Sequence, residues 1–202
     1  MTAPSRIVLA TGNAGKVREI QAVLAASNIT IVPQSEFATP EADETGTTFV
    51  ENAIIKARNA AAHTGLPAIA DDSGLVVDAL NGAPGVYSSR FAGANSNDAE
   101  NNSLLLEKMQ NVAEGSRTAH FECVIAYMRH ASDPTPIVAH GTWEGRILYE
   151  AMGENGFGYD PLFFVPEQGC SSAQLRPEIK NRISHRGQAI QQFVTLFNGV
   201  YL

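Results

Sequence analysis

The sequence predicts one α/β domain in which helices flank a mixed β-sheet. Its opening alternates strand, helix and strand, its middle carries two long β-rich runs around a proline turn, and two later segments have the apolar period of amphipathic helices. At 202 residues, without a repeat or a Pro-rich linker, the chain is predicted to form a single domain over residues 1–202.

The first third predicts a β-α-β unit. Residues Ile7 to Ala10 form an apolar run typical of a buried strand, and a second strand is predicted from Thr30 to Val32. A helix is predicted between them, from Lys16 to about Ala26. Its apolar residues recur on one helical face and are Val17, Ile20, Val23 and Leu24.

A second helix and a short strand follow. Thr48 and Glu51 have the spacing of a capping box, which predicts a helix running to about His63. Residues Ala68 to Ala70 predict a buried strand that ends at Asp71. The run from Asp71 to Gly74 consists of turn-forming residues, so a solvated turn is the alternative to a functional role there.

The second half predicts a hairpin and two more helices. Strands are predicted at Ala119 to Met128 and at Ile137 to Trp143, with the turn at Asp133 to Pro136 making them antiparallel. Apolar residues at helical spacing predict helices from Asp98 to Val112 and from Gly187 to Phe197.

Composition excludes several classes of protein. The formal net charge of -7 argues against a protein that coats nucleic acid, because such binding neutralises many phosphates with Lys and Arg. Cys123 and Cys170 are far apart in sequence and form neither a zinc-ligand pattern nor a disulfide framework. No run is long and apolar enough to span a membrane, and residues Met1 to Arg6 contain no apolar core, so we expect a cytoplasmic protein.

The first candidate site is an anion-binding loop between a strand and a helix. Its residues are Thr11, Gly12, Asn13, Ala14, Gly15 and Lys16. Free amides at a helix N-terminus favour an anion, and Lys16 adds a positive charge. The loop differs from the common P-loop, since only two residues separate its first glycine from Gly15 and no Ser or Thr follows Lys16. The alternative is an ordinary turn in which Asn13 caps the helix.

Carboxylates suggest a second candidate site, for Mg²⁺. This ion prefers oxygen ligands and usually takes one or two protein carboxylates, so Glu44 and one residue of the pair Asp71 and Asp72 would suffice. Adjacent strand residues point to opposite faces, so these two aspartates are predicted to have different roles. We expect the other acidic residues of this region, Glu36, Glu41 and Asp43, to be solvated charges.

Lys56 is a candidate second cation for a bound triphosphate. It lies eight residues after Thr48 and therefore shares a helical face with Thr48 and Asn52. A solvated surface lysine is the alternative.

The third candidate site is a glycine-rich aromatic loop near the C-terminus. The sequence from Gly156 to Pro161 places Phe157 and Tyr159 among glycines, which suits stacking of Phe157 on a planar base, with core packing as the alternative. Further on, His185 and Arg186 occupy the first turn of the last predicted helix, where the helix dipole disfavours cations unless a partner compensates. With Lys180 and Arg182 they supply donors for the carbonyl oxygens of a base or for phosphate.

Taken together, these motifs resemble the inosine triphosphate pyrophosphatases, also called noncanonical purine nucleoside triphosphate pyrophosphatases or RdgB-like proteins. The matching segments extend in one order over nearly the whole chain. They are Thr11 to Lys16, Glu44 to Gly46, Glu51 to Ala57, Ala70 to Gly74, Gly82 to Gly85, Gly156 to Pro161 and Ser184 to Arg186.

This resemblance implies a fold, an activity and a set of site residues. The fold is an elongated mixed β-sheet flanked by helices, with two lobes and a central cleft, usually in a homodimer. The activity is Mg²⁺-dependent hydrolysis of ITP, dITP, XTP and dXTP to the monophosphate and pyrophosphate. The sequence itself leaves Mn²⁺ open as the alternative working metal.

The resemblance also assigns roles to residues of this chain. Residues Thr11 to Lys16 and Lys56 would hold the triphosphate, and Glu44 and Asp72 the metal, with Asp72 accepting the proton of the attacking water. Ser73 would touch the substrate and Phe157 would stack on the base. The purine pocket would be shaped by Gly158, Tyr159, Asp160, Lys180, His185 and Arg186.

Two alternatives stay open from sequence alone. One is a Maf-like pyrophosphatase acting on modified pyrimidine nucleotides, against which the aromatic loop and the segment Ser184 to Arg186 argue. The other is a nucleotide sensor without turnover, against which the joint presence of Glu44, Lys56 and Asp72 argues.

Overall fold

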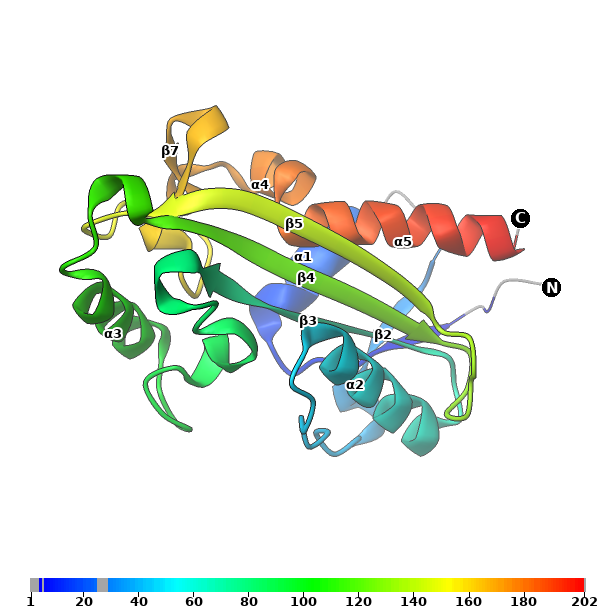
Figure 1. The fold of residues 1–202 in the computed structure, drawn as a ribbon. Helices are drawn as coiled ribbons and strands as arrows, with labels where there is room; N and C mark the ends of the chain where they lie inside the picture. The colour runs from blue at the N-terminus through cyan, green and yellow to red at the C-terminus, as the bar shows by residue number, and fades with distance from the viewer. Residues whose placement is uncertain (1–3, 5, 25–28, 202) are drawn as a thin grey trace. The chain divides into compact units, whose positions relative to one another are not determined.

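The computed structural model describes residues 4, 6–24 and 29–201 (Figure 1). Its described strands form one seven-stranded sheet in the order β2-β1-β3-β4-β5-β6-β7. The strands are β1 (Ile7–Leu9), β2 (Ile31–Pro33), β3 (Ala68–Val77), β4 (Thr118–Met128), β5 (Ile137–Ile147), β6 (Phe163–Val165) and β7 (Cys170–Ser171). The helices are α1 (Ala14–Leu24), α2 (Phe49–Thr64), α3 (Asp98–Met109), α4 (Pro177–Ile183) and α5 (His185–Tyr201).

The sheet is mixed, as predicted. Strand β1 pairs in parallel with β2 and β3, while β6 pairs antiparallel with β5 and β7. Strands β4 and β5 are neighbours joined by only eight residues, 129–136, which is too short for a parallel crossover and confirms the predicted hairpin.

Several predicted boundaries need correction. Strand β3 does not end at Asp71 but runs on to Val77, so the segment from Asp71 to Gly74 is strand and not turn. The predicted end of the first helix at Ala26 lies outside the described residues, and α1 begins at Ala14 rather than at Lys16. The capping box of Thr48 and Glu51 is confirmed at the start of α2.

The described residues group into two compact units. The first comprises residues 1–72, 123–141 and 185–202, and the second comprises residues 73–122 and 142–184. Strands β3, β4 and β5 contribute residues to both units. The single-domain organisation stays a prediction.

In the first unit, strand alternation sends apolar side chains to both faces of the sheet. Ile7 and Leu9 pack with α1 and α5 in one buried cluster, whereas Val8 and Ala10 pack with α2 in another. The alternation of strand side chains therefore makes this part of the sheet the middle of three layers. The buried residues that helix α2 contributes to its cluster are all alanines, namely Ala53, Ala57, Ala60 and Ala61, and the partly buried Phe49 and Ile54 pack beside them.

In the second unit, an aromatic cluster forms the core. Phe121, Trp143 and Phe163 lie with ring centroids 4.6 to 6.5 Å apart and pack with Leu105 and Met109 of α3. Arg117 is 2% exposed and donates to four backbone carbonyl oxygens, those of Met109, Val112, Ile147 and Leu148. These hydrogen bonds compensate the burial of its charge.

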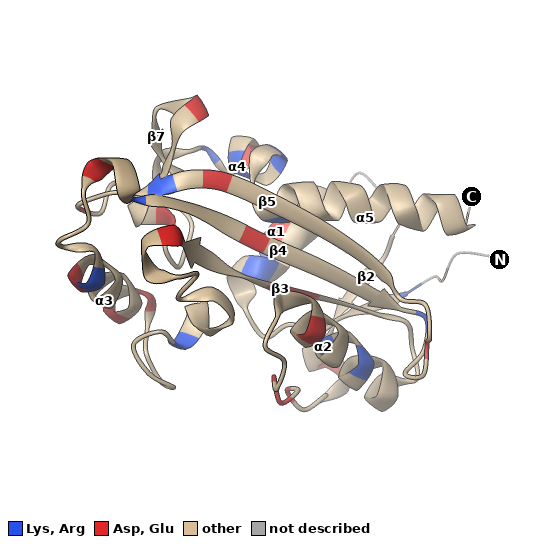
Figure 2. Ribbon diagram, viewed as in Figure 1, with Lys and Arg blue, Asp and Glu red and all other residues tan. Residues whose placement is uncertain are grey.

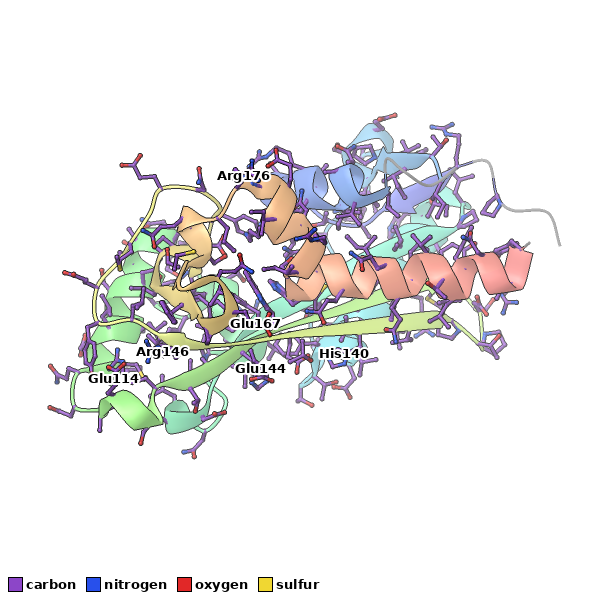
Figure 3. The ribbon with its side chains drawn as sticks, turned by 90° about the horizontal axis from the view of Figure 1, so that it is seen from above. Glu114, His140, Glu144, Arg146, Glu167 and Arg176 are labelled. Carbon is purple, nitrogen blue, oxygen red and sulfur yellow. The ribbon has the colours of Figure 1, made fainter. Side chains whose placement is uncertain are left out.

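The surface of the second unit carries a solvated ion pair. Arg146 Nη1 lies 2.8 Å from Glu114 Oε1, and the guanidinium lies 4.4 Å from the centroid of the Phe164 ring; Figure 3 labels both charged residues. An exposed pair of this kind contributes about 0 to 1 kcal/mol. Among the residues described, no helix is long and apolar enough to cross a membrane.

Candidate active site

The predicted anion-binding loop connects β1 to α1 in the first unit. Asn13 Oδ1 accepts from the amides of Gly15 at 2.9 Å and Lys16 at 3.1 Å, so Asn13 caps α1. Thr11 Oγ1 in turn accepts from Asn13 N at 3.2 Å. A Cβ added at Gly12 would lie 2.7 Å from Glu41 Oε1, which places the Glu41 carboxylate against this loop. Glu41 is exposed, as predicted.

Asp71 is fully buried and pairs with two cations from different elements. Its Oδ2 lies 3.0 Å from Lys16 Nζ of α1 and 3.4 Å from Arg186 Nη2 of α5. Burial alone would raise the pKa of Asp71, but Lys16, Arg186 and Lys56 outweigh it and hold that pKa below its ordinary value. Asp71 is therefore an anion that joins α1 and α5 to β3.

Arg186 is itself enclosed by carboxylates. It is 2% exposed, and its Nη1 also pairs with Glu19 of α1. Burial disfavours the charged guanidinium, but Asp71 and Glu19 more than compensate, so the pKa of Arg186 is raised. These two acidic partners resolve the conflict with the helix dipole noted from sequence. His185 is the first residue of α5 and is also buried.

Asp72 points to the opposite face of β3 from Asp71 and meets a different cation. Its Oδ1 lies 2.7 Å from Lys56 Nζ of α2, and the same Nζ lies 3.0 Å from Glu44 Oε1. Lys56 therefore brings the two predicted metal-binding carboxylates together. Oδ2 of Asp72 is buried and has no hydrogen-bond partner among the residues that the structure describes.

The charges of this group influence each other's protonation. Burial raises the pKa of Asp72, and Lys56 only partly offsets this effect. Burial works against the charged form of Lys56, but Asp72, Asp71 and Glu44 together raise its pKa. In Figure 2 the strands are mostly tan, with charged residues at few positions along them. The buried Asp71 and Asp72 of β3 are therefore exceptions in the sheet.

The first turn of α2 positions the acidic segment that carries Glu44. Asn52 is fully buried and its Oδ1 accepts from Gly46 N at 2.9 Å. Glu51 Oε2 accepts from the amides of Thr47 and Thr48, both at 2.9 Å. The sequence predicted the cap but not the role of Asn52. The available sequence feature was an asparagine on the same helical face as Lys56.

The aromatic loop lies in the second unit and is organised by Asp160. The Oδ2 of this 2%-exposed carboxylate lies 2.6 Å from Lys180 Nζ and accepts from Phe157 N at 2.9 Å, and Ser172 donates to its Oδ1 at 2.8 Å. A Cβ at Gly156 would overlap Asp160 Oδ2, and Gly156 also has a φ of 78°, so this position requires glycine.

The two aromatic residues of this loop differ in burial. Phe157 is half-buried, with Lys180 Nζ 5.0 Å from its ring centroid. Tyr159 is buried in the core, and its hydroxyl donates to the backbone oxygen of Ser88 at 2.8 Å. Burial raises the pKa of Tyr159, with Asp98 adding to the effect. Of the two rings, Phe157 is the one with a partly accessible face.

The predicted site residues thus form two groups, each within its own unit. In the first unit, Asp71 pairs with Lys16 and Arg186, and Lys56 pairs with Glu44 and Asp72. Asp71 also raises the pKa of Lys56 through its charge. In the second unit, Asp160 connects Phe157 and Lys180, and Gly158 and Tyr159 belong to the same loop. Ser73 follows Asp72 along β3 and is half-buried.

Comparisons with known proteins cover nearly the full chain. The sequence model of the Ham1 family matches residues 7–196. A dITP/XTP pyrophosphatase of Thioalkalivibrio sulfidiphilus is 58% identical over 194 residues, which are 96% of this chain and 99% of that protein. A dITP/XTP pyrophosphatase of Vibrio parahaemolyticus is 62% identical over 186 residues, or 92% of this chain and 93% of that protein.

A solved structure agrees in fold. A HAM1 protein from Coxiella burnetii superposes with a TM-score of 0.90 at 52% identity, covering 98% of this chain and all of that one. The resemblance inferred from the motifs is confirmed by these matches. The chain therefore belongs to the Ham1 family.

Proposed function

We propose that this protein hydrolyses the noncanonical purine nucleotides ITP, dITP, XTP and dXTP to the monophosphate and pyrophosphate, and so removes them from the nucleotide pool. The proposal is based mainly on the position of Lys56, whose Nζ lies within 3.0 Å of carboxylate oxygens of both Glu44 and Asp72. Two carboxylates and a lysine gathered at one point suit hydrolysis of a phosphoanhydride. The names of the relatives, dITP/XTP pyrophosphatases, support the same substrates.

The triphosphate would be held by the loop from Thr11 to Lys16 and by Lys56. The capped N-terminus of α1 offers backbone amides, and the two lysines carry positive charge. Lys16 is paired with Asp71 and Lys56 with Asp72, so both ammonium groups have fixed positions before substrate arrives. Fixed charges of this kind stabilise a transition state without needing to reorganise.

The donor set fits Mg²⁺, with Mn²⁺ as the alternative ion. Glu44 and Asp72 are hard oxygen donors that meet at Lys56, and Asp72 Oδ2 is buried without a hydrogen-bond partner among the described residues. No cluster of three or more His, Cys, Asp or Glu side chains occurs in the described part of the chain, so two carboxylates are the ligands we propose. When bound, the ion would neutralise charge on the phosphate oxygens.

Asp72 is the proposed proton acceptor for the attacking water. Its raised pKa, which follows from burial, makes it a stronger base than a solvated carboxylate. The water oxygen forms a new bond to one of the two phosphorus atoms of the α–β anhydride, and a water proton passes to Asp72. The bond from that phosphorus to the bridging oxygen breaks, which gives the monophosphate and pyrophosphate.

Base recognition is proposed to use stacking on Phe157. Asp160 accepts a hydrogen bond from the Phe157 amide, and Lys180 Nζ lies over the Phe157 ring. Ser73 would also contact substrate. His185 and Arg186 are donors that match the 6-keto oxygen of hypoxanthine and xanthine but would confront the 6-amino group of adenine.

A homodimer working in the cytoplasm completes the proposal. The dimer rests on the family resemblance and the cytoplasm on the location of the nucleotide pool. Sedimentation equilibrium at micromolar concentration would give twice the chain mass of 21.6 kDa, and a monomer at that concentration would contradict it.

Product analysis tests the proposed reaction. We expect dITP with Mg²⁺ to give equal amounts of pyrophosphate and dIMP, EDTA to stop the reaction, and added Mg²⁺ or Mn²⁺ to restore it. Release of orthophosphate would move the cleavage to the outer phosphate. Tight dITP binding without turnover would identify a sensor instead of an enzyme.

A further inference from the structure

Helix α3 begins beside the aromatic loop, and its first turn has an unusual polar composition. Asn97 and Glu100 form a reciprocal capping box, so the helix end is already satisfied. Asp98 and Asn102 are four residues apart and therefore lie on the same face of α3. Neither residue is needed for the cap.

Both of these side chains contact the backbone of one residue of the aromatic loop, Gly158. Asp98 Oδ2 accepts from Gly158 N at 2.7 Å, and Asn102 Nδ2 donates to Gly158 O at 2.8 Å. The amide and the carbonyl of Gly158 are thus both held by α3. Gly158 has a φ of 60° and directly follows Phe157, so fixing it also restricts the backbone from which the Phe157 ring extends.

Asn102 is a poor choice for helix stability alone. Asparagine is a weak helix former within a helix. Its Oδ1 is buried and has no hydrogen-bond partner within the described ranges, and burying an unsatisfied acceptor is unfavourable. A local cost of this kind is expected where a residue serves a site.

The remaining contacts of the loop come from elsewhere. Asp160 accepts from Phe157 N at 2.9 Å and pairs with Lys180, while Tyr159 donates to Ser88 O. These contacts hold the loop on either side of Gly158. The α3 contacts therefore act on the one residue between the stacking ring and the buried tyrosine.

We propose that Asp98 and Asn102 are positioning residues for purine binding, which hold the backbone N–H and C=O of Gly158 and thereby orient Phe157 toward the base. The inference rests on the proposed function, because it assigns Phe157 the stacking role. Neither side chain is proposed to touch substrate. Their effect is on substrate affinity and base preference rather than on the chemical step.

Kinetics with matched variants tests this assignment. Asp98→Ala and Asn102→Ala are expected to raise KM for dITP by about 3- to 30-fold, with kcat changed by less than about threefold, as the loss of one or two hydrogen bonds implies. Asp98→Asn keeps an oxygen acceptor and is expected to recover most of the wild-type KM. Glu100→Ala removes one of the two hydrogen bonds of the capping box, at a residue between Asp98 and Asn102 that has no hydrogen bond to Gly158, so it controls for weakening of α3.

Hydrogen exchange gives a readout independent of turnover. The Gly158 amide is expected to exchange at least about tenfold faster in Asp98→Ala than in wild type or in Glu100→Ala, because its acceptor is gone. Unchanged exchange, or KM values equal to those of Glu100→Ala, would overturn the inference. Faster exchange with unchanged KM would also overturn it, because Asp98 and Asn102 would then hold the loop without affecting substrate binding. Wild-type protein without dITP turnover would instead refute the proposed function.

Discussion

Two adjacent aspartates have different environments because β3 alternates its side chains. Asp71 faces α1 and α5 and pairs with Lys16 and Arg186, whereas Asp72 faces α2 and pairs with Lys56. Asp71 is fully buried between two cations, whereas Asp72 shares Lys56 with Glu44, the other carboxylate predicted to bind metal. These partners support a structural role for Asp71 and agree with the catalytic role proposed for Asp72.

Replacing each aspartate by asparagine separates these roles. Asp72→Asn is expected to lower kcat by about 100- to 10,000-fold, the usual contribution of a general base, while the melting temperature stays near that of wild type. Asp71→Asn is expected to lower the free energy of unfolding by about 3 to 5 kcal/mol, because it leaves buried cations uncompensated. Pyrophosphate release and urea unfolding measure the two effects. Near-normal turnover of Asp72→Asn would refute its role as the base.

The ring of Phe157 is proposed to stack on the purine base. Phe157→Ala is expected to raise KM for dITP by about 5- to 150-fold, which corresponds to the 1 to 3 kcal/mol of one stacked base. Phe157→Trp keeps a stacking surface and serves as the control. If alanine changes stability but not KM, the ring belongs to the core.

Single residues also show what sequence can and cannot predict. The motif at Thr11 to Lys16 and the residues Glu44, Lys56 and Asp72 could be singled out because their types and spacing suit phosphate and metal. Asn52, Asp98 and Asn102 could not, because an isolated asparagine or aspartate has many ordinary roles. Their roles depend on hydrogen bonds to backbone groups, of Gly46 for Asn52 and of Gly158 for Asp98 and Asn102, which form only in the folded chain.

At the scale of elements, Gly141 of β5 sets how closely α5 approaches the sheet. A Cβ there would overlap His185 O and lie 2.7 Å from Ala189 N, both in the first turns of α5. These turns carry His185 and Arg186. Backbone atoms cannot move aside as a flexible side chain can, so a larger residue would displace the helix.

Two alanine substitutions test this contact. Gly141→Ala is expected to lower the free energy of unfolding by about 1 to 3 kcal/mol or more through overpacking. Gly199→Ala, in α5 with no atom within 4 Å of the added Cβ, is expected to raise it by about 0.4 to 1 kcal/mol. Urea unfolding measures the free energy of unfolding of both variants. Equal values for the two would show that α5 shifts to accommodate the added methyl group at position 141 without loss of stability.

The turn between β4 and β5 gives a pH-dependent prediction. Asp133 is buried and accepts from Arg129 Nε at 2.8 Å and Thr135 N at 3.0 Å, and the Arg129 hydrogen bonds hold the pKa of Asp133 below its ordinary value. A lowered pKa in the folded state stabilises the protein above the unfolded pKa of about 3.9, and this contribution is lost as pH falls through the folded pKa.

Asp133→Asn is therefore expected to lower the free energy of unfolding by about 1 to 3 kcal/mol at pH 7, with a smaller difference from wild type at pH 3. Ser132→Ala, at an exposed neighbouring position, is expected to stay within about 0.5 kcal/mol at both pH values. A difference that does not shrink at low pH would show that the charge of Asp133 is not the cause.

Elements themselves were predicted well where their pattern was regular. The capping box of α2 and the β4–β5 hairpin have strong local signals, and both are present. The end of β3 was wrong because Asp71, Asp72, Ser73 and Gly74 are turn formers by type. Their burial as strand residues is stabilised by Lys16, Arg186 and Lys56, cations that local sequence does not reveal.

At the scale of the whole molecule, distant segments supply each site. Lys56 and Asp72 come from neighbouring elements, but Asp71 and Arg186 are separated by more than half of the chain. The first unit itself is built from three separate stretches of sequence. Motif order could indicate the family, while the pairing of charges required the tertiary structure.

The central claim is selective pyrophosphate release from noncanonical purine nucleotides. Its most direct test is kcat/KM for ITP, dITP, XTP and dXTP against ATP and GTP, measured with Mg²⁺ on one enzyme preparation. We expect values for the first four at least about 100-fold above those for ATP and GTP, a ratio that differential hydrogen bonding to a base can supply. Equal values for ITP and ATP would contradict it.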